Sequence, residues 1–78
     1  MTVSVVIPAY VFDDATHDMT VRCLALLRKH SPEAEIVLAL RGPNDEYDAD
    51  EIVKPRKVGY SPAVNAGIAR ATGDIIVV

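Results

Sequence analysis

One short stretch of the chain gathers acidic and imidazole side chains that could chelate a divalent cation. It reads DDATHD and holds Asp13, Asp14, His17 and Asp18. A histidine beside carboxylates is a possible metal-ligand pair, but this spacing matches no recognised metal cage. Acidic residues are also common at the start of a helix, where they interact favourably with the positive end of its dipole. The pattern therefore favours helix-start acids, and no metal ligand is predicted in this chain.

Cys23 is the other residue whose type could do covalent chemistry, and it is the only cysteine. It stands among leucines in a helical pattern, where a thiol usually serves as a small apolar side chain. A single cysteine allows no disulfide within the chain. We therefore expect Cys23 to be buried and not to act as a nucleophile.

Apolar runs rich in β-branched residues predict the strands that must position any site. VSVVI (residues 3–7, closed by Pro8) and EIVLAL (residues 35–40) are typical of parallel strands covered on both faces, and DIIVV (residues 74–78) returns to the same sheet. A short helical turn over residues 48–52 is also expected. A weak strand over residues 53–58 should follow it at the edge of the sheet, because it contains a proline.

The first helix is predicted from about Thr16 or Asp18 to His30. Its apolar positions recur at intervals of three and four residues and predict one buried stripe: Met19, Cys23, Leu26 and Leu27.

A second helix has clear end signals. Ser61 is expected as its N-cap and Pro62 as its first helical residue, and Gly73 lies just past its end.

Strands that alternate with helices in this way predict an α/β fold. We expect an open parallel sheet of three to four strands with helices packed on it, Rossmann-like, with residues 1–78 forming a single partial domain. Parallel sheets bind ligands outside the carboxyl ends of their strands, where the strand order reverses. The loops that would meet there are PAY after the first strand, RGPND after the second, and whatever follows Val78.

Charge and hydropathy exclude several classes of partner. The net charge is −3 and the eight Lys and Arg residues are scattered, so no nucleic acid is expected. No run approaches the roughly 20 apolar residues of a membrane span. Residues 1–12 lack the basic region of a signal peptide, and a cytoplasmic location is expected.

Five segments together carry a resemblance to a known family. SVVIPAY, CLALL, EIVLALRGPND, GYSPAVNAGI and ATGDIIVV occur in the same order and spacing as in the amino-terminal half of family 2 glycosyltransferases with the GT-A fold. The resemblance covers essentially the whole chain. It implies that this chain is the part that binds the nucleotide of a sugar donor.

The resemblance also implies donor-binding residues. Family members set the nucleoside against the loop after the first strand, here Pro8, Ala9 and Tyr10. The Tyr10 ring could cover a base or ribose, or it could simply cap the core at a strand end.

The family's G-x-x-x-A-x-N-x-G stretch is matched by Gly59, Ala63, Asn65 and Gly67. Asn65 could touch the donor or fix the loops, and Gly59 could meet a turn's need for an unusual φ. Gly67 is a poor helix former, so close packing on the sheet should compensate for it.

One departure from the family concerns base recognition. Family members usually carry an aspartate at the end of the second strand, and Leu40 stands there in this chain. Leucine can only pack, so no recognition of the base by a carboxylate is expected at this position. The neighbouring Arg41 could place a guanidinium near a diphosphate, although an ordinary surface arginine is the commoner explanation.

The other departures concern catalysis. The family's Asp-x-Asp, which holds Mg²⁺ or Mn²⁺ in an intact relative, would begin just after Val78. Asp74 cannot replace it, because it lies about 13 Å from the far end of its strand. The family's catalytic base belongs to the carboxyl-terminal half. We expect a donor-binding fragment with weak or lost nucleotide-sugar binding and no sugar transfer; the alternative is a non-catalytic α/β binding or assembly module.

The last strand predicts an assembly. DIIVV would expose an apolar edge that can pair with another molecule. A homo-oligomer formed through this strand is expected.

Overall fold

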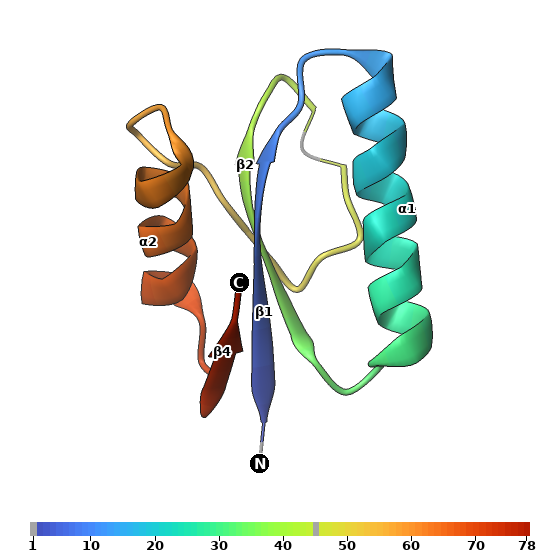
Figure 1. The fold of residues 1–78 in the computed structure, drawn as a ribbon, viewed down its shortest axis with the longest axis vertical. Coiled ribbons are helices and arrows are strands. Elements are labelled where there is room, and N and C mark those ends of the chain that lie inside the picture. Colours follow the sequence, from blue (N-terminus) through green and yellow to red (C-terminus); the bar gives the residue numbers. More distant parts are fainter. Residues whose placement is uncertain (1, 45) are drawn as a thin grey trace.

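The computed structural model describes residues 2–44 and 46–78, which form a parallel sheet with one helix on each face (Figure 1). In chain order the elements are β1 (Val3–Tyr10), α1 (Asp14–His30), β2 (Glu35–Arg41), β3 (Glu51–Val53), α2 (Tyr60–Arg70) and β4 (Ile75–Val77).

The four strands lie in the order β3-β2-β1-β4 and are all parallel. The chain moves outward from β1 through β2 to β3. Helix α2 then connects β3 to β4, which lies on the other side of β1. The strand order thus reverses between β1 and β4, as it does at the ligand-binding crevice of open α/β sheets. The predicted α/β class with an open, Rossmann-like parallel sheet is confirmed.

β2 is the most buried strand, since residues 36–40 have no exposed surface. Its side chains alternate between the two faces of the sheet. Ile36, Leu38 and Leu40 form a cluster with Leu24 of α1. Val37 faces the other layer, because its neighbour across the ladder is Val6, which lies against Gly67 of α2.

The predicted buried stripe of α1 is largely wrong. Met19 is 69% exposed and Leu26 is 50% exposed, and Cys23 is also exposed. The sheet instead buries Leu24, which is 2% exposed, with Leu27 packed beside it. Two apolar stripes overlap in this helix, and spacing alone does not tell which of them faces the sheet.

Both helices begin earlier than their sequence signals predicted. α1 begins at Asp14 because Asp13 is the N-cap, with its Oδ1 accepting a hydrogen bond from the Thr16 amide at 2.8 Å. α2 begins at Tyr60 with Gly59 as N-cap, so the prediction of Ser61 as N-cap is wrong. Pro62 is tolerated as the third helical residue because the first-turn amides have no partner within the helix.

Two strand predictions also need correction. Pro8 does not close β1, which continues to Tyr10; Pro8 lies beyond Val5, the last residue that pairs with β4, so its missing N–H interrupts no ladder on that side. The expected helical turn over residues 48–52 and the strand over 53–58 are replaced by the short edge strand β3. Its position at the edge agrees with the prediction.

No helix in residues 2–44 or 46–78 combines the length and the apolar character that a membrane crossing needs.

Candidate functional site at the carboxyl edge of the sheet

A cavity of about 380 Å³ lies where β1 and β2 end and α2 begins. This is the edge of the sheet that parallel strands direct toward their ligands. The lining residues come from three segments: Pro8, Ala9, Tyr10, Arg41, Val58, Gly59, Tyr60 and Ala63.

The structure brings five of the six predicted donor-site residues to this cavity, namely Pro8, Ala9, Tyr10, Arg41 and Gly59. Asn65 does not line it. Asn65 is exposed on α2, and its side-chain amide makes no hydrogen bond with the residues that the structure describes.

Val58 and Tyr60 also line the cavity but were not predicted. Both are largely exposed, at 63% and 67%. The sequence signal that could have found them was the glycine between them, just before the helix. In the structure Gly59 turns the chain there with φ +129°. A glycine turn that leads directly into a helix presents its neighbours at the helix start.

Tyr10 and Arg41 are direct neighbours because the β1–β2 register pairs them. Side chains paired in this way lie on the same face of the sheet. Tyr10 is 55% exposed, so it does not cap the core. Its ring lies 4.7 Å from the ring of Phe12, centroid to centroid, and the two planes are tilted by 50°.

The guanidinium of Arg41 is hydrogen-bonded to the segment that follows β3. Its Nη1 donates to the carbonyl of Pro55 at 3.3 Å. Its Nε is buried and has no hydrogen-bond partner in the described part of the chain. Arg41 is thus only partly satisfied by the protein at the wall of the cavity.

Leu40 points away from this cavity. It is fully buried in the cluster that α1 covers. Because side chains alternate along a strand, the last β2 residue on the cavity face is Arg41 and not Leu40. A carboxylate at position 40 would enter the apolar core, which explains physically why a leucine occupies it.

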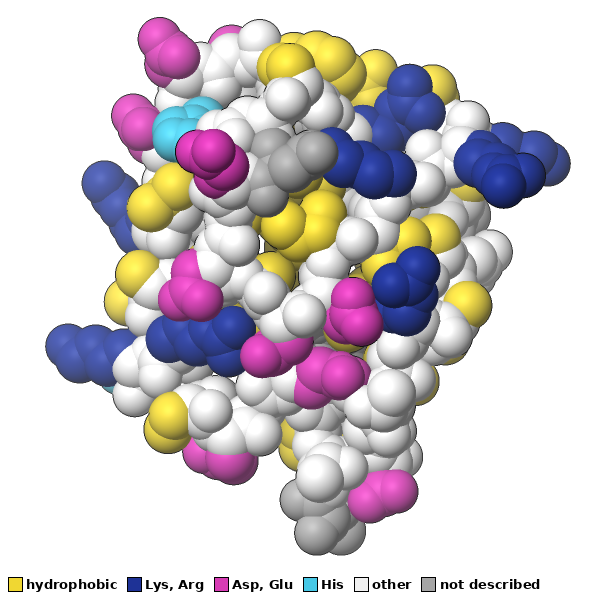
Figure 2. All heavy atoms as spheres, turned by 180° about the vertical axis from the view of Figure 1, so that it is seen from behind, with side chains coloured by type: hydrophobic (Ala, Val, Ile, Leu, Met, Phe, Trp, Pro, Cys, Tyr) yellow, Lys and Arg dark blue, Asp and Glu magenta, His cyan; other side chains and the backbone are white. Residues whose placement is uncertain are grey.

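Further positive charge lies in the segment between β3 and α2. This segment contains Lys54, Arg56 and Lys57, and Lys54 Nζ donates to the Gly42 carbonyl at 3.3 Å. Figure 2 shows Lys and Arg side chains gathered on the upper right of the view from behind. The N-terminal end of α2, which carries no acidic residue in its first turn, adds the positive end of a helix dipole.

Gly42 allows the loops that follow β1 and β2 to touch. The Val11 amide donates to the Arg41 carbonyl at 2.8 Å. A Cβ on Gly42 would lie 2.1 Å from the Val11 carbonyl oxygen, and the residue has φ +153°. This contact joins the two strand ends that carry Tyr10 and Arg41.

The acidic stretch near the start of α1 is used structurally. The hydroxyl and amide of Thr16 hydrogen-bond to Asp13 and hold the pKa of its carboxyl below its ordinary value. His17 Nδ1 lies 2.9 Å from the Tyr47 hydroxyl. Residues 2–44 and 46–78 contain no group of three or more His, Cys, Asp or Glu side chains that could hold a metal ion.

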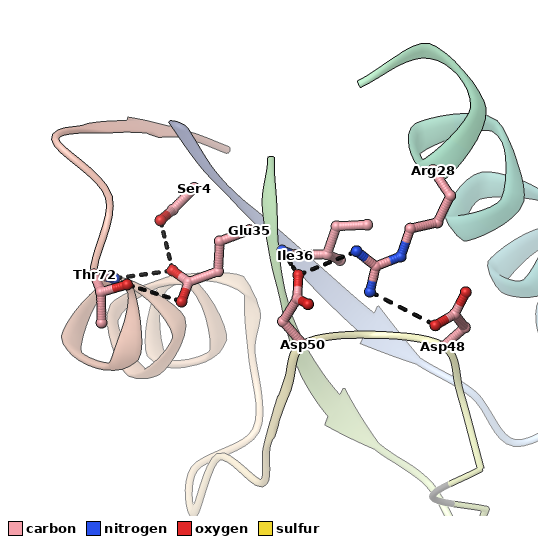
Figure 3. A network of polar contacts seen from close by, with 7 residues as sticks. All are labelled: Ser4, Arg28, Glu35, Ile36, Asp48, Asp50 and Thr72. Carbon is pink, nitrogen blue, oxygen red and sulfur yellow. Dashed lines mark hydrogen bonds and ion pairs between the residues drawn. The ribbon is translucent and has the colours of Figure 1, made fainter. Parts of the chain in front are cut away.

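An Asp-x-Asp triplet does occur in the chain, at residues 48–50, but its carboxylates belong to the opposite edge of the sheet (Figure 3). Asp50 Oδ2 accepts from the Ile36 amide at 2.7 Å and lies 3.2 Å from Arg28 Nη1. Asp48 Oδ1 lies 3.6 Å from Arg28 Nη2. The Ile36 hydrogen bond, and after it Arg28, lowers the pKa of Asp50, while burial opposes this shift.

Glu35 links other residues at this amino edge, which is the side of the sheet where the strands begin. Its carboxylate accepts from the Ser4 hydroxyl at 2.6 Å and from the amide and hydroxyl of Thr72, both at 2.9 Å. These three bonds hold the pKa of Glu35 below its ordinary value. Asp74 lies at the same end of the strands, where its Oδ2 is 3.4 Å from the Thr2 amide. It comes directly before β4, which begins at Ile75 and not at the predicted residue 74.

Comparisons with protein-family models, with curated proteins and with solved structures find no match to this chain.

Proposed function

We propose that this chain binds the nucleotide-diphosphate part of a sugar donor, as the donor-binding portion of a family 2, GT-A-type glycosyltransferase. The observation that supports this proposal is the pairing of Tyr10 and Arg41 at the carboxyl edge of β1 and β2, in one cavity beside the start of α2.

Each part of the cavity suits one part of such a donor. The exposed rings of Tyr10 and Tyr60 offer flat apolar faces against which a base or ribose can lie. The Arg41 guanidinium and the start of α2 offer positive charge to a diphosphate. The cavity is of the size class that holds small organic ligands.

The proposal is limited to binding. In intact relatives Mg²⁺ or Mn²⁺ supports the leaving diphosphate as a Lewis acid. The described residues do not fit such an ion, because they hold no metal-ligating cluster and the residue 48–50 triplet is engaged at the other edge. We therefore derive no transfer step for this chain.

A thermal-shift titration with UDP-glucose and GDP-mannose, each with and without Mn²⁺, tests this proposal. Ligand at ten times its dissociation constant should add about 1.4 kcal/mol to the free energy of unfolding. In a domain of this size that raises the Tm by roughly 5–10 °C. No shift at about 10 mM of either ligand, where even millimolar affinity would register, refutes the proposal.

Matched variants place the binding site. Arg41→Gln and Tyr10→Ala should abolish the shift. Arg22→Gln removes an exposed arginine from α1, away from the cavity, and should leave the shift unchanged. Equal shifts in Arg41→Gln and Arg22→Gln would place any binding elsewhere.

A second function, assembly, is favoured by the state of β4. This strand lies at the edge of the sheet, and its three residues are exposed. An exposed apolar edge strand can pair with a strand of another chain, and we infer that copies join through β4. Light scattering of Ile76→Lys tests this, with Ile68→Lys as control because the two isoleucines are 39% and 38% exposed. A wild-type monomer at tens of micromolar would refute it.

A further inference from the structure

The outer side of α1 carries an apolar stripe that no predicted or proposed function uses. It consists of Met19, Cys23 and Leu26, and we call it the outer stripe. A groove of about 520 Å³ runs along it, and Arg22, Leu27 and His30 complete its lining. Figure 1 shows α1 at the periphery of the molecule, with the sheet on one side only.

The outer stripe and the sheet-facing stripe are distinct. At 100° per residue, Leu24 lies about 140° around the helix axis from Met19. Leu24 is 2% exposed, whereas Met19 is 69% exposed. The intervals of four and three residues between Met19, Cys23 and Leu26 are those of the seam between two paired helices.

The charges beside the outer stripe favour one kind of partner. Asp14 and Asp18 lie in the first half of the helix, Arg22 lies at its middle and Lys29 lies in its last turn, all on the same flank. In an antiparallel pair of identical helices this flank faces the same flank of the other helix, which runs in the opposite direction. Lys29 of one copy therefore lies between Asp14 and Asp18 of the other. The two Arg22 side chains lie near the centre of the pair. A parallel pair about a twofold axis would set this flank against the opposite, uncharged flank of the partner helix, so its acidic and basic residues would not meet. It would also align the two helix dipoles unfavourably.

We propose that two copies of this chain associate through the outer stripe, with their α1 helices antiparallel about a twofold axis beside Cys23. In this arrangement Met19 of one copy packs on Leu26 of the other, since the two residues lie equally far from an axis that passes between Arg22 and Cys23. Asp18 approaches Lys29 of the partner copy. Cys23 lies near the middle of a helix that spans residues 14–30, so the two thiols come close together.

The size of the helix sets the strength of the association. A helix of 17 residues is about 25 Å long. One such pair buries less than the roughly 800 Å² per partner of a standard interface. The dimer is therefore weak and depends on concentration.

Crosslinking through the only cysteine tests the proposal. The wild-type chain at about 300 µM, a concentration suited to a weak dimer, is treated with a short bis-maleimide, and the covalent dimer is quantified by denaturing electrophoresis. Leu26→Lys should lower the dimer yield about tenfold, because it places a charge in the apolar seam. Val21→Lys is the matched control, since Val21 is 47% exposed and lies about 200° from Met19 on the same helix.

A charge exchange tests the antiparallel direction. Sedimentation equilibrium should show weaker association for Asp18→Lys, with recovery in Asp18→Lys combined with Lys29→Asp. Ile76→Lys, which disrupts pairing through β4, should leave the Cys23 crosslink unchanged. Equal crosslinking of Leu26→Lys and Val21→Lys, or a strictly monomeric wild-type chain at that concentration, overturns the proposal, and failure of the double variant to recover overturns the antiparallel arrangement.

Discussion

Gly67→Ala should destabilise this protein even though alanine is the better helix former. Gly67 lies on the face of α2 that packs against β1, and a Cβ built on it would lie 2.3 Å from Val6 Cγ1. Val6 is 1% exposed and stiff at χ1, so its methyl groups have little room to move. The added methyl group must push the helix from the sheet or distort Val6.

The magnitude follows from two opposing effects. Alanine in place of glycine in a helix interior gains about 1 kcal/mol. Overpacking of a close contact costs about 1–3 kcal/mol, and an overlap of more than 1 Å places this site at the upper end. The net loss is therefore about 1–2 kcal/mol, or a Tm lower by roughly 5–15 °C in a domain of this size.

Thermal melting followed by circular dichroism at 222 nm measures this effect. Asn65→Ala is the control, because the Asn65 side chain is exposed on the same helix and has no hydrogen-bond partner among the described residues. It should gain about 0.5 kcal/mol from helix propensity alone. The double variant Gly67→Ala with Val6→Ala should lose less than the sum of the single losses, since one change makes room for the other.

An unchanged or raised Tm in Gly67→Ala would refute the close packing of α2 on β1. Strict additivity in the double variant would locate the cost elsewhere than at Val6.

Two further predictions test the core and the amino edge. Leu24→Ala should lower the free energy of unfolding by about 2–5 kcal/mol, because Leu24 is buried. Leu26→Ala should lower it by less than about 0.5 kcal/mol at low micromolar concentration, where α1 is unpaired. Urea denaturation that ranks the two variants otherwise would contradict the orientation of α1. Hydrogen bonds lower the folded pKa of Glu35 from its ordinary value of 4.5, so its stabilising effect is present above that value and is lost as the pH falls through the folded pKa. Wild type should lose more stability than Glu35→Gln between about pH 6 and pH 3, and parallel pH profiles of the urea midpoint would contradict this role.

The fold class was predictable because its signals are local and repeated. The β-branched runs at residues 3–7 and 35–40 identify buried strands by composition alone. The helices between them force parallel connections. The same reasoning brought Tyr10 and Arg41 to one edge of the sheet, since parallel strands end on the same side.

The errors share a physical cause, which is that periodicity does not give absolute orientation. Met19, Cys23 and Leu26 have helical spacing as good as that of Leu24 and Leu27, and only the packed structure shows which set the sheet covers. Register decides the outcome at the end of β2 in the same way. Leu40 and Arg41 are adjacent in sequence, but alternation places one in the core and the other at the cavity.

The helix starts show a second limit of local signals. Asp13 and Ser61 are both good N-cap residues, yet only Asp13 caps a helix here. Gly59 takes the cap of α2 because the chain must turn there with φ +129°, a conformation that side chains resist. Tertiary geometry therefore overrode the stronger capping residue, and it placed Tyr60 at the wall of the cavity.

The polar groups at the two ends of the strands differ in how fully the protein hydrogen-bonds them, and this bears on where a ligand can bind. At the amino edge Glu35 and Asp50 accept bonds from β1, β2, α1 and the loop before β4, so their polar groups are largely satisfied within the protein. At the carboxyl edge Arg41 keeps a buried Nε without a partner in the described chain, and Tyr10 and Tyr60 remain exposed. The Nε is buried and out of reach of a ligand, so the exposed rings are the contact surface that this end of the sheet offers. The carboxylates at the opposite ends of the strands, which are satisfied within the protein, hold together the strands that bring Tyr10 and Arg41 side by side.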